Sequence, residues 1–187
     1  MAIIRPFKAI RPARDKASLV ASRSYLSYDE ATIKEKLDHN PYTFLHVINP
    51  DYNNTVKSVG ITKYKLIKNK LHDFINNKIL IKEDSDKYYI YQKSNHNNTF
   101  TGIIASTSIK DYLDNKIKIH EQTILKRENI FKDYLEITEF NAEPVLLSHE
   151  PNKKINLILE KFINLRAEYE FTTTNKSLHK LWLVDNT

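Results

Sequence analysis

The chain has 187 residues, a net charge of +6 and no cysteine, and its length suits one domain or two small lobes that share a core. The lack of cysteine excludes disulfides, thiolate nucleophiles, cysteine zinc sites and iron–sulfur clusters. Gly60 and Gly102 are the only glycines, which excludes Walker A and Rossmann loops, because both need clustered glycines. No apolar run resembles a signal peptide or a membrane span of ~20 residues. We therefore expect a soluble cytoplasmic protein.

The first half of the chain predicts an extended arm, two helices and a strand between them. Residues 3–12 alternate and contain two prolines, which suits an edge strand or an extended arm. Residues 29–40 predict a short helix that ends before Pro41. Residues 42–50 alternate in polarity and predict a buried strand. Residues 61–80 place apolar side chains three and four positions apart, as an amphipathic helix does.

The second half alternates strands and helices. Strands are predicted at 87–93, 100–109, 117–123 and 143–149, with an asparagine-rich turn between the first two, and helices at 125–140 and 152–166. Residues 167–174 and 177–184 predict a closing hairpin. The alternation predicts a mixed sheet covered by helices, between the α/β and α+β classes, with antiparallel hairpins. Because the chain stops directly after a strand, we expect residues 1–187 to be the N-terminal part of a longer protein.

His120 and Glu121 are the leading candidates for chemistry, since they end a predicted strand just before a predicted helix. Neighbouring strand residues point to opposite faces, so we expect at most one of them to face a ligand at the strand end. Thr123 would cap the helix and leave free amides that can hold an anion, with Lys126 and Arg127 adding positive charge. The competing interpretation is structural, with a glutamate paired to a lysine and a threonine that only caps the helix.

Other candidate residues lie outside that segment. Arg5 and Arg11, each followed by proline, could hold an anion from a rigid extended segment or could simply protect an edge strand. His46 alternates with apolar neighbours, which favours a structural role, although it stays a candidate contact. His149 and Glu150 form a second pair, but the spacing that places two metal ligands on one helical face is absent, so we predict no metal site.

Nucleic acid is not an expected partner. Lysines alternate with tyrosines in residues 63–78 and 87–93, a composition that can bind single strands by stacking and phosphate contacts. The lysines are interspersed with acids, as on solvated helix faces, and the periodicity assigns most of the aromatic residues to the core. No helix-turn-helix or RNP signature is present. The oligomeric state stays open.

Several segments, taken in order, resemble one family. They are residues 4–12 (IRPFKAIRP), 40–48 (NPYTFLHVI), 118–123 (KIHEQT) and 140–147 (FNAEPVLL), with LHKLWLV near the C-terminus. The set resembles the N-terminal half of the bacterial family known as domain of unknown function number one thousand and fifteen. The resemblance covers essentially the whole chain.

The resemblance implies a longer protein whose second half carries a Gly-His-His-Arg motif and is similar to the ParB/sulfiredoxin-type nucleotide-binding fold of free-serine kinases. It implies a small-molecule kinase or phosphotransferase with a phosphorylated or nucleotide ligand, and ATP or ADP with magnesium in the full-length protein. The family commonly continues its His-Glu-x-Thr motif with Arg-Pro and a later Asp-Arg pair, where Ile124-Leu125 and Ile130-Phe131 stand here. The alternative is a non-catalytic interaction module that binds protein or nucleic acid through its basic surface.

Overall fold

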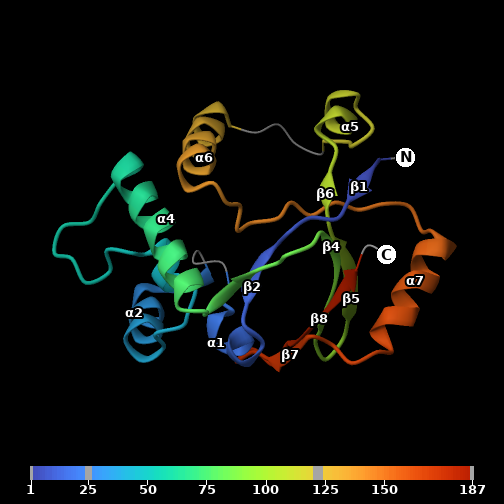
Figure 1. The fold of residues 1–187 in the computed structure, drawn as a ribbon, viewed down its shortest axis with the longest axis horizontal. Helices are drawn as coiled ribbons and strands as arrows, with labels where there is room; N and C mark the ends of the chain where they lie inside the picture. The colour runs from blue at the N-terminus through green and yellow to red at the C-terminus, as the bar shows by residue number, and fades with distance from the viewer. Residues whose placement is uncertain (1, 24–26, 120–123, 186–187) are drawn as a thin grey trace. The chain divides into compact units, whose positions relative to one another are not determined.

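The computed structural model describes residues 2–23, 27–119 and 124–185, and the chain forms two compact units (Figure 1). Unit 1 contains Met1–Ile10, Lys82–His120 and Glu143–Thr187, and unit 2 contains Arg11–Ile81 and Glu121–Ala142. Each unit is therefore assembled from segments that are far apart in the sequence. The α/β to α+β class with antiparallel hairpins is confirmed.

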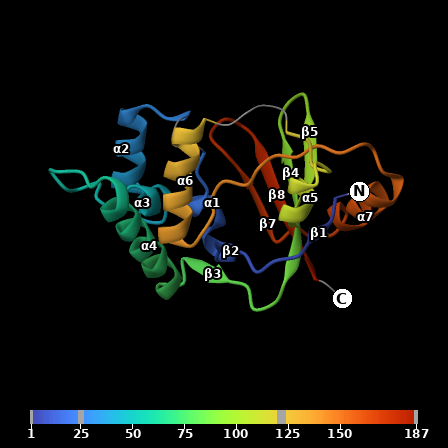
Figure 2. The same ribbon diagram turned by 90° about the horizontal axis from the view of Figure 1, so that it is seen from above.

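Unit 1 is built around a four-stranded antiparallel sheet (Figure 2). Its strands, in spatial order, are β5 (Thr99–Ile104), β4 (Lys87–Ser94), β8 (Leu178–Asp185) and β7 (Tyr169–Thr172). The asparagine-rich turn is confirmed, because the Asn95 side chain accepts the N–H groups of Asn97 and Asn98 at 3.0 and 2.9 Å. The predicted closing hairpin is confirmed as the pairing of β7 with β8.

Helix α7 (Lys153–Ile163) covers one face of this sheet. Its side chains pack against a buried cluster that includes Ile90 of β4 and Trp182 of β8. The Trp182 indole donates to the carbonyl of Leu165 at 2.9 Å, so its one polar group is satisfied. The residues of β4 and β8 that alternate with this pair lie on the opposite face.

The short elements of unit 1 are β1 (Ile4–Arg5), which pairs with β6 (Ser106–Thr107), and α5 (Ile109–Leu113). Asp111 of α5 connects this helix to the residue before β1, because its buried carboxylate accepts the backbone N–H of Ile3 at 2.7 Å. The same carboxylate accepts the ammonium of Lys116 at 2.7 Å. The Lys116 hydrogen bond is the main reason that the pKa of Asp111 is lowered.

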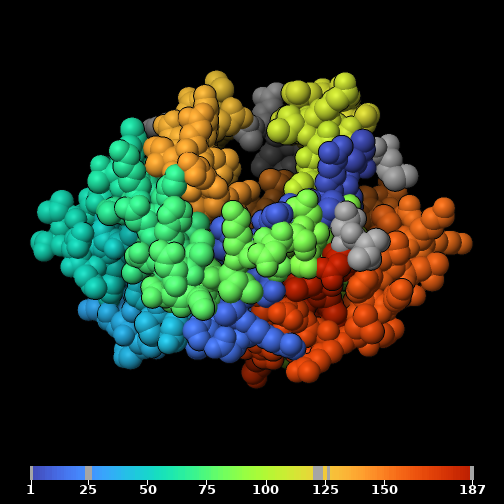
Figure 3. All heavy atoms as spheres, in the orientation of Figure 1, coloured from blue at the N-terminus to red at the C-terminus, as the bar shows by residue number. Residues whose placement is uncertain are grey.

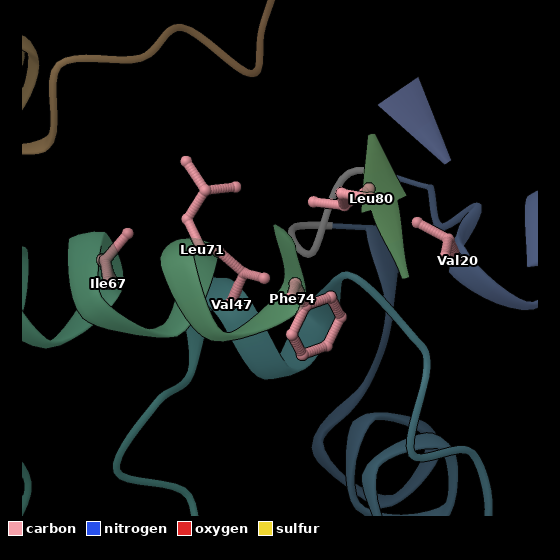
Figure 4. Close-up of a cluster of buried hydrophobic side chains, with 6 residues drawn as sticks. All are labelled: Val20, Val47, Ile67, Leu71, Phe74 and Leu80. Atoms are coloured by element: carbon pink, nitrogen blue, oxygen red, sulfur yellow. The ribbon is translucent and has the colours of Figure 1, made fainter. Parts of the chain in front are cut away.

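Unit 2 is mainly helical. Strands β2 (Ile10–Pro12) and β3 (Leu80–Lys82) pair with each other and carry the chain into and out of it. The helices are η1 (Arg14–Lys16), α1 (Ala17–Val20), α2 (Glu30–His39), α3 (Leu45–Ile48), α4 (Gly60–Asn76) and α6 (Leu125–Thr138). Figure 4 shows a buried core cluster of unit 2, to which α1, α3, α4 and β3 contribute Val20, Val47, Ile67, Leu71, Phe74 and Leu80.

Residues 42–50 correct one prediction, since they contain the short helix α3 where a strand was expected. Local hydrogen bonds turn the chain there: the N–H of Tyr42 donates to the Asn40 side chain and that of His46 to the Thr43 carbonyl. A short apolar run fits a buried helix as well as a strand, so the alternation alone could not distinguish them.

One further predicted strand is corrected, because residues 143–149 form neither helix nor strand. Of the strand predicted at 117–123, residues 117–119 are not in a strand, and the other four lie outside the described residues. Leu146 of the first segment is exposed, so its apolar character does not reflect burial. No helix in the described ranges combines the length and the apolar character needed to span a membrane.

Candidate functional site

The predicted anion site falls at the start of α6, and the structure describes only part of it. His120, Glu121 and Thr123 lie outside the described residues, as does the side chain of Lys126. The description of this site therefore begins at Ile124, the residue before the helix.

The start of α6 lacks a side-chain cap at its N-cap residue. Ile124 has no polar side-chain atom, and its carbonyl accepts the N–H groups of Arg127 and Glu128 at 2.7 and 3.1 Å. Arg127 is exposed, and no ion pair with another described residue is found for it. An uncapped helix start with an arginine in its first turn can attract a carboxylate or a phosphate. Side chains of α6 lie at the surface in Figure 3.

Helix α6 is held in place by α4. The ring of Tyr134 meets that of Tyr64 edge-on, with 5.6 Å between centroids, and the Lys68 ammonium pairs with Glu139 at 2.7 Å. The Lys68 hydrogen bond is the main reason that the pKa of Glu139 is lowered. Because the contacts advance in the same direction along both chains, the two helices are parallel and their N-terminal ends point the same way. The Thr138 hydroxyl donates to the Tyr134 carbonyl at 2.7 Å.

His46 lies on α3 within unit 2 and is half-buried. Its Nε2 is 3.1 Å from the carbonyl of Asn40. Burial lowers the pKa of His46, and the charge of Lys70 lowers it further. A neutral ring therefore donates from Nε2 to this carbonyl and closes the turn that begins α3. The contact accounts for the position of His46 without a ligand.

The two candidate arginines belong to different units. Arg5 is exposed on β1 of unit 1, where its backbone pairs with Ser106. Arg11 lies on β2, on the unit 2 side of the boundary, is half-buried and has interaction partners of its own. Neither unit by itself therefore contains both arginines.

The second His-Glu pair lies in the exposed segment before α7. His149 Nδ1 is 2.7 Å from the backbone carbonyl of Glu150, so the ring is engaged by its own neighbour. Within the described ranges, no group of three or more His, Cys, Asp or Glu side chains could hold a metal ion.

A polar network on the sheet of unit 1 did not emerge from the sequence. The Tyr91 hydroxyl is 2.6 Å from His179 Nδ1, and His179 Nε2 is 3.5 Å from Thr173 Oγ1. Burial raises the pKa of Tyr91 and lowers that of His179. We therefore assign a phenol that donates to the Nδ1 of a neutral imidazole, whose Nε2–H faces the threonine.

The network lies on the sheet face opposite α7. Its side chains alternate along β4 and β8 with Ile90 and Trp182, which face α7. The period-two pattern of each strand could have placed Tyr91 and His179 on one face. Nothing local in the sequence pairs the two strands, which are about 90 residues apart, so the contact itself had no sequence signal.

The family model described as "Protein of unknown function (DUF1015)" matches residues 4–187, essentially the whole chain. No curated protein and no solved structure matches the chain.

Proposed function

This chain belongs to the DUF1015 family of proteins of unknown function, and on that premise we propose that it is the N-terminal domain of a cytoplasmic bacterial protein, similar to a small-molecule kinase, that binds a phosphorylated or nucleotide ligand. The single observation that carries the proposal is the exposed Arg127 in the first turn of α6, whose N-cap residue has no polar side chain. The resemblance of residues 118–123 to the family's His-Glu-x-Thr motif supports it, because that segment leads into this helix.

The physical basis is the positive end of a helix. The first N–H groups of an α-helix have no intrahelical acceptor, and the helix dipole adds partial positive charge there. The N–H groups of Leu125 and Lys126 precede the first ones that bond to Ile124. A guanidinium beside them adds a permanent charge and paired donors that match phosphate oxygens. We therefore place the ligand's phosphate at this end of α6.

In the proposed mechanism, Lys126 and Arg127 hold the phosphate, and His120 or Glu121 polarises or deprotonates the acceptor group. Such a site works by positioning and electrostatics, not by covalent catalysis. ATP with magnesium would supply the phosphoryl group in a longer protein. The first turn of α6 would hold the phosphate oxygens, and magnesium would be held by those oxygens with one or two carboxylates. No magnesium ligand is named among the described residues.

The test compares two single-charge losses on the same helix. Arg127→Ala removes the charge from the first turn, and Lys132→Ala removes one from the helix middle, where Lys132 pairs with Glu136 at 3.7 Å on the surface. Titration calorimetry with ATP, ADP and inorganic phosphate measures binding to each variant. We expect Arg127→Ala to weaken binding about tenfold, the loss of one charge-assisted contact, and Lys132→Ala to bind as the wild type does.

Equal affinities for the two variants would remove the helix start from the site. If the unaltered protein binds none of the three anions, the proposal fails as a whole. The non-catalytic interaction module then takes its place.

A further inference from the structure

The sheet face opposite α7 carries one row of side chains that differs from the rest of unit 1. The strand register pairs Lys93 with both Phe100 and His179, and pairs His179 with Phe171. Paired residues of neighbouring strands point to the same face. These four side chains, one from each strand, therefore form a continuous line across the sheet, here called the aromatic row.

The aromatic row is accessible at its β5 end. Phe100 is 64% exposed, and Lys93 beside it is also exposed. A large aromatic ring left open on a sheet face loses the stabilisation that burial would give it, about 25 cal/mol for each Å². Lys93 makes no ion pair with another described residue. The row thus combines an accessible ring with a cation that has no acid partner in the described part of the chain.

The other end of the row is pre-organised. The His179 ring stacks on Phe171 with 5.3 Å between centroids and 6° between planes, and the Tyr91 hydroxyl holds it from the neighbouring row. Burial, with a smaller effect of the Lys93 charge, lowers the pKa of His179. The imidazole is therefore a flat neutral ring, and Lys93 carries the row's charge. Rings fixed before binding lose little conformational entropy when a ligand stacks on them.

The next row leaves space above the sheet. Gly102 is paired with Tyr91, and none of the described atoms comes within 4 Å of the position that a Cβ on this glycine would take. The β5 side of Tyr91 is therefore open, and the accessible surface continues from the aromatic row toward the middle of the sheet.

We propose that this face binds single-stranded nucleic acid, a site distinct from the start of α6. Strands in a sheet lie about 4.8 Å apart, so the rings of Phe100 and Phe171 stand about 14 Å apart across three spacings. A single nucleotide cannot reach both rings, whereas a strand of several nucleotides can stack bases at each end and place a phosphate over Lys93 between them. A duplex hides the faces of its bases and offers nothing to stack.

Charge supports this occupant over an apolar peptide. The chain carries a net charge of +6, and Lys93 lies between the rings, where an apolar side chain would serve a hydrophobic partner better. The proposal departs from the sequence analysis, which weighed nucleic acid only for residues 63–78 and 87–93 and did not expect it as a partner. Phe100 lies outside both ranges and is exposed.

The test uses fluorescence anisotropy with a short labelled oligonucleotide, as single-stranded DNA, as RNA of the same sequence and as a duplex. Phe100→Ala removes the accessible ring, and Phe100→Tyr keeps it. Lys93→Ala is matched by Lys180→Ala, since Lys180 is also on the sheet but on the α7 side, where it pairs with Glu170 at 3.3 Å. Both lysine variants lose one positive charge, and only one loses it from the row.

We expect Phe100→Ala to weaken single-strand binding about tenfold, the loss of one stacked base, and Phe100→Tyr to retain it. Lys93→Ala should bind several-fold more weakly and with a shallower salt dependence, by about one phosphate contact. Lys180→Ala should bind as the wild type does.

Several outcomes would overturn the proposal. They are equal losses for the two lysine variants, equally tight binding of the duplex, unchanged binding by Phe100→Ala, and no binding by the unaltered protein at low salt. Because Arg127 is not in the row, failure of this test leaves the anion site of α6 untouched.

Discussion

Two phenylalanines, one in each unit, have opposite environments. In unit 2, the ring of Phe74 is almost fully buried in the helical core. In unit 1, one sheet face is covered by α7 while Phe100 remains exposed on the other. The same residue type therefore stabilises the fold at one position and is available for binding at the other. Sequence composition does not distinguish the two roles, and burial does.

The largest expected effect comes from replacing these two phenylalanines. Phe74→Ala leaves a cavity in the core of unit 2 and should lower the free energy of unfolding by about 3–5 kcal/mol. Phe100→Ala removes an exposed ring and should change it by less than about 0.5 kcal/mol. Urea unfolding measures both. A large loss of stability for Phe100→Ala would mean that this ring belongs to a core, and the comparison between the units would collapse.

Replacing the two glycines should have the next largest effect on stability. The backbone requires a glycine at the position in unit 2 and does not require one at the position in unit 1. Gly60 has φ +55°, in the left-handed region, whereas Gly102 lies in a strand with open space around it. Gly60→Ala should cost about 1–2 kcal/mol, because a Cβ strains that conformation. Gly102→Ala should leave stability unchanged or slightly higher. Thermal unfolding of both variants checks this, and the reverse order would contradict it.

Removal of a single hydroxyl has a smaller effect. Tyr91→Phe keeps the ring but leaves His179 Nδ1 without its donor, and should lower the free energy of unfolding by about 1 kcal/mol. The matched variant Tyr88→Phe also loses a hydroxyl from β4, but that hydroxyl makes only an exposed 3.4 Å contact with the carbonyl of Ile4. Equal urea midpoints for the two variants would show that the network does not order the sheet.

The smallest effect is a shared response to pH. Burial lowers the pKa of His46 in unit 2 and of His179 in unit 1. The unfolded chain binds protons at these histidines near pH 6.5 while the folded one does not. The contribution of these two histidines to the free energy of unfolding is therefore fully present above about pH 6.5, and it is lost as the pH falls below that value. Histidine NMR titration should give both residues a pKa below the ordinary one. A raised pKa for either would contradict the prediction.

Local patterns predicted the elements whose signals are local. The helix predicted at residues 61–80 from apolar spacing is observed as α4, Gly60–Asn76, and the turn at residues 95–98 follows from its asparagines. The strand predicted at residues 42–50 was wrong because alternation over five residues, 44–48, does not separate a short buried helix from a strand. The strand predicted at residues 143–149 was wrong because the apolar side chains of this segment are exposed. Neither failure could be corrected without knowing which side chains are buried.

The two candidate sites also differ in whether their signal is local in the sequence. The sequence directed attention to residues 120–127, where a motif is contiguous, and Arg127 is the only candidate site residue of that segment with a described side chain. The aromatic row is invisible in the sequence, since its four members come from four strands. Pairing between strands sets their proximity, and no local pattern encodes it.

The interleaving of the two units has a consequence for biosynthesis. Every segment of unit 2 ends by Ala142, so a ribosome synthesises all of its helices before β7 and β8. Until then β4 and β5 are a lone hairpin, which is marginal in water, and β4 lacks the partner that pairs Lys87 with Asp185, 98 residues later. The nascent chain thus carries an unprotected strand edge for much of its synthesis. Neither unit can be obtained by a single truncation, because each is made of separate stretches of the same chain.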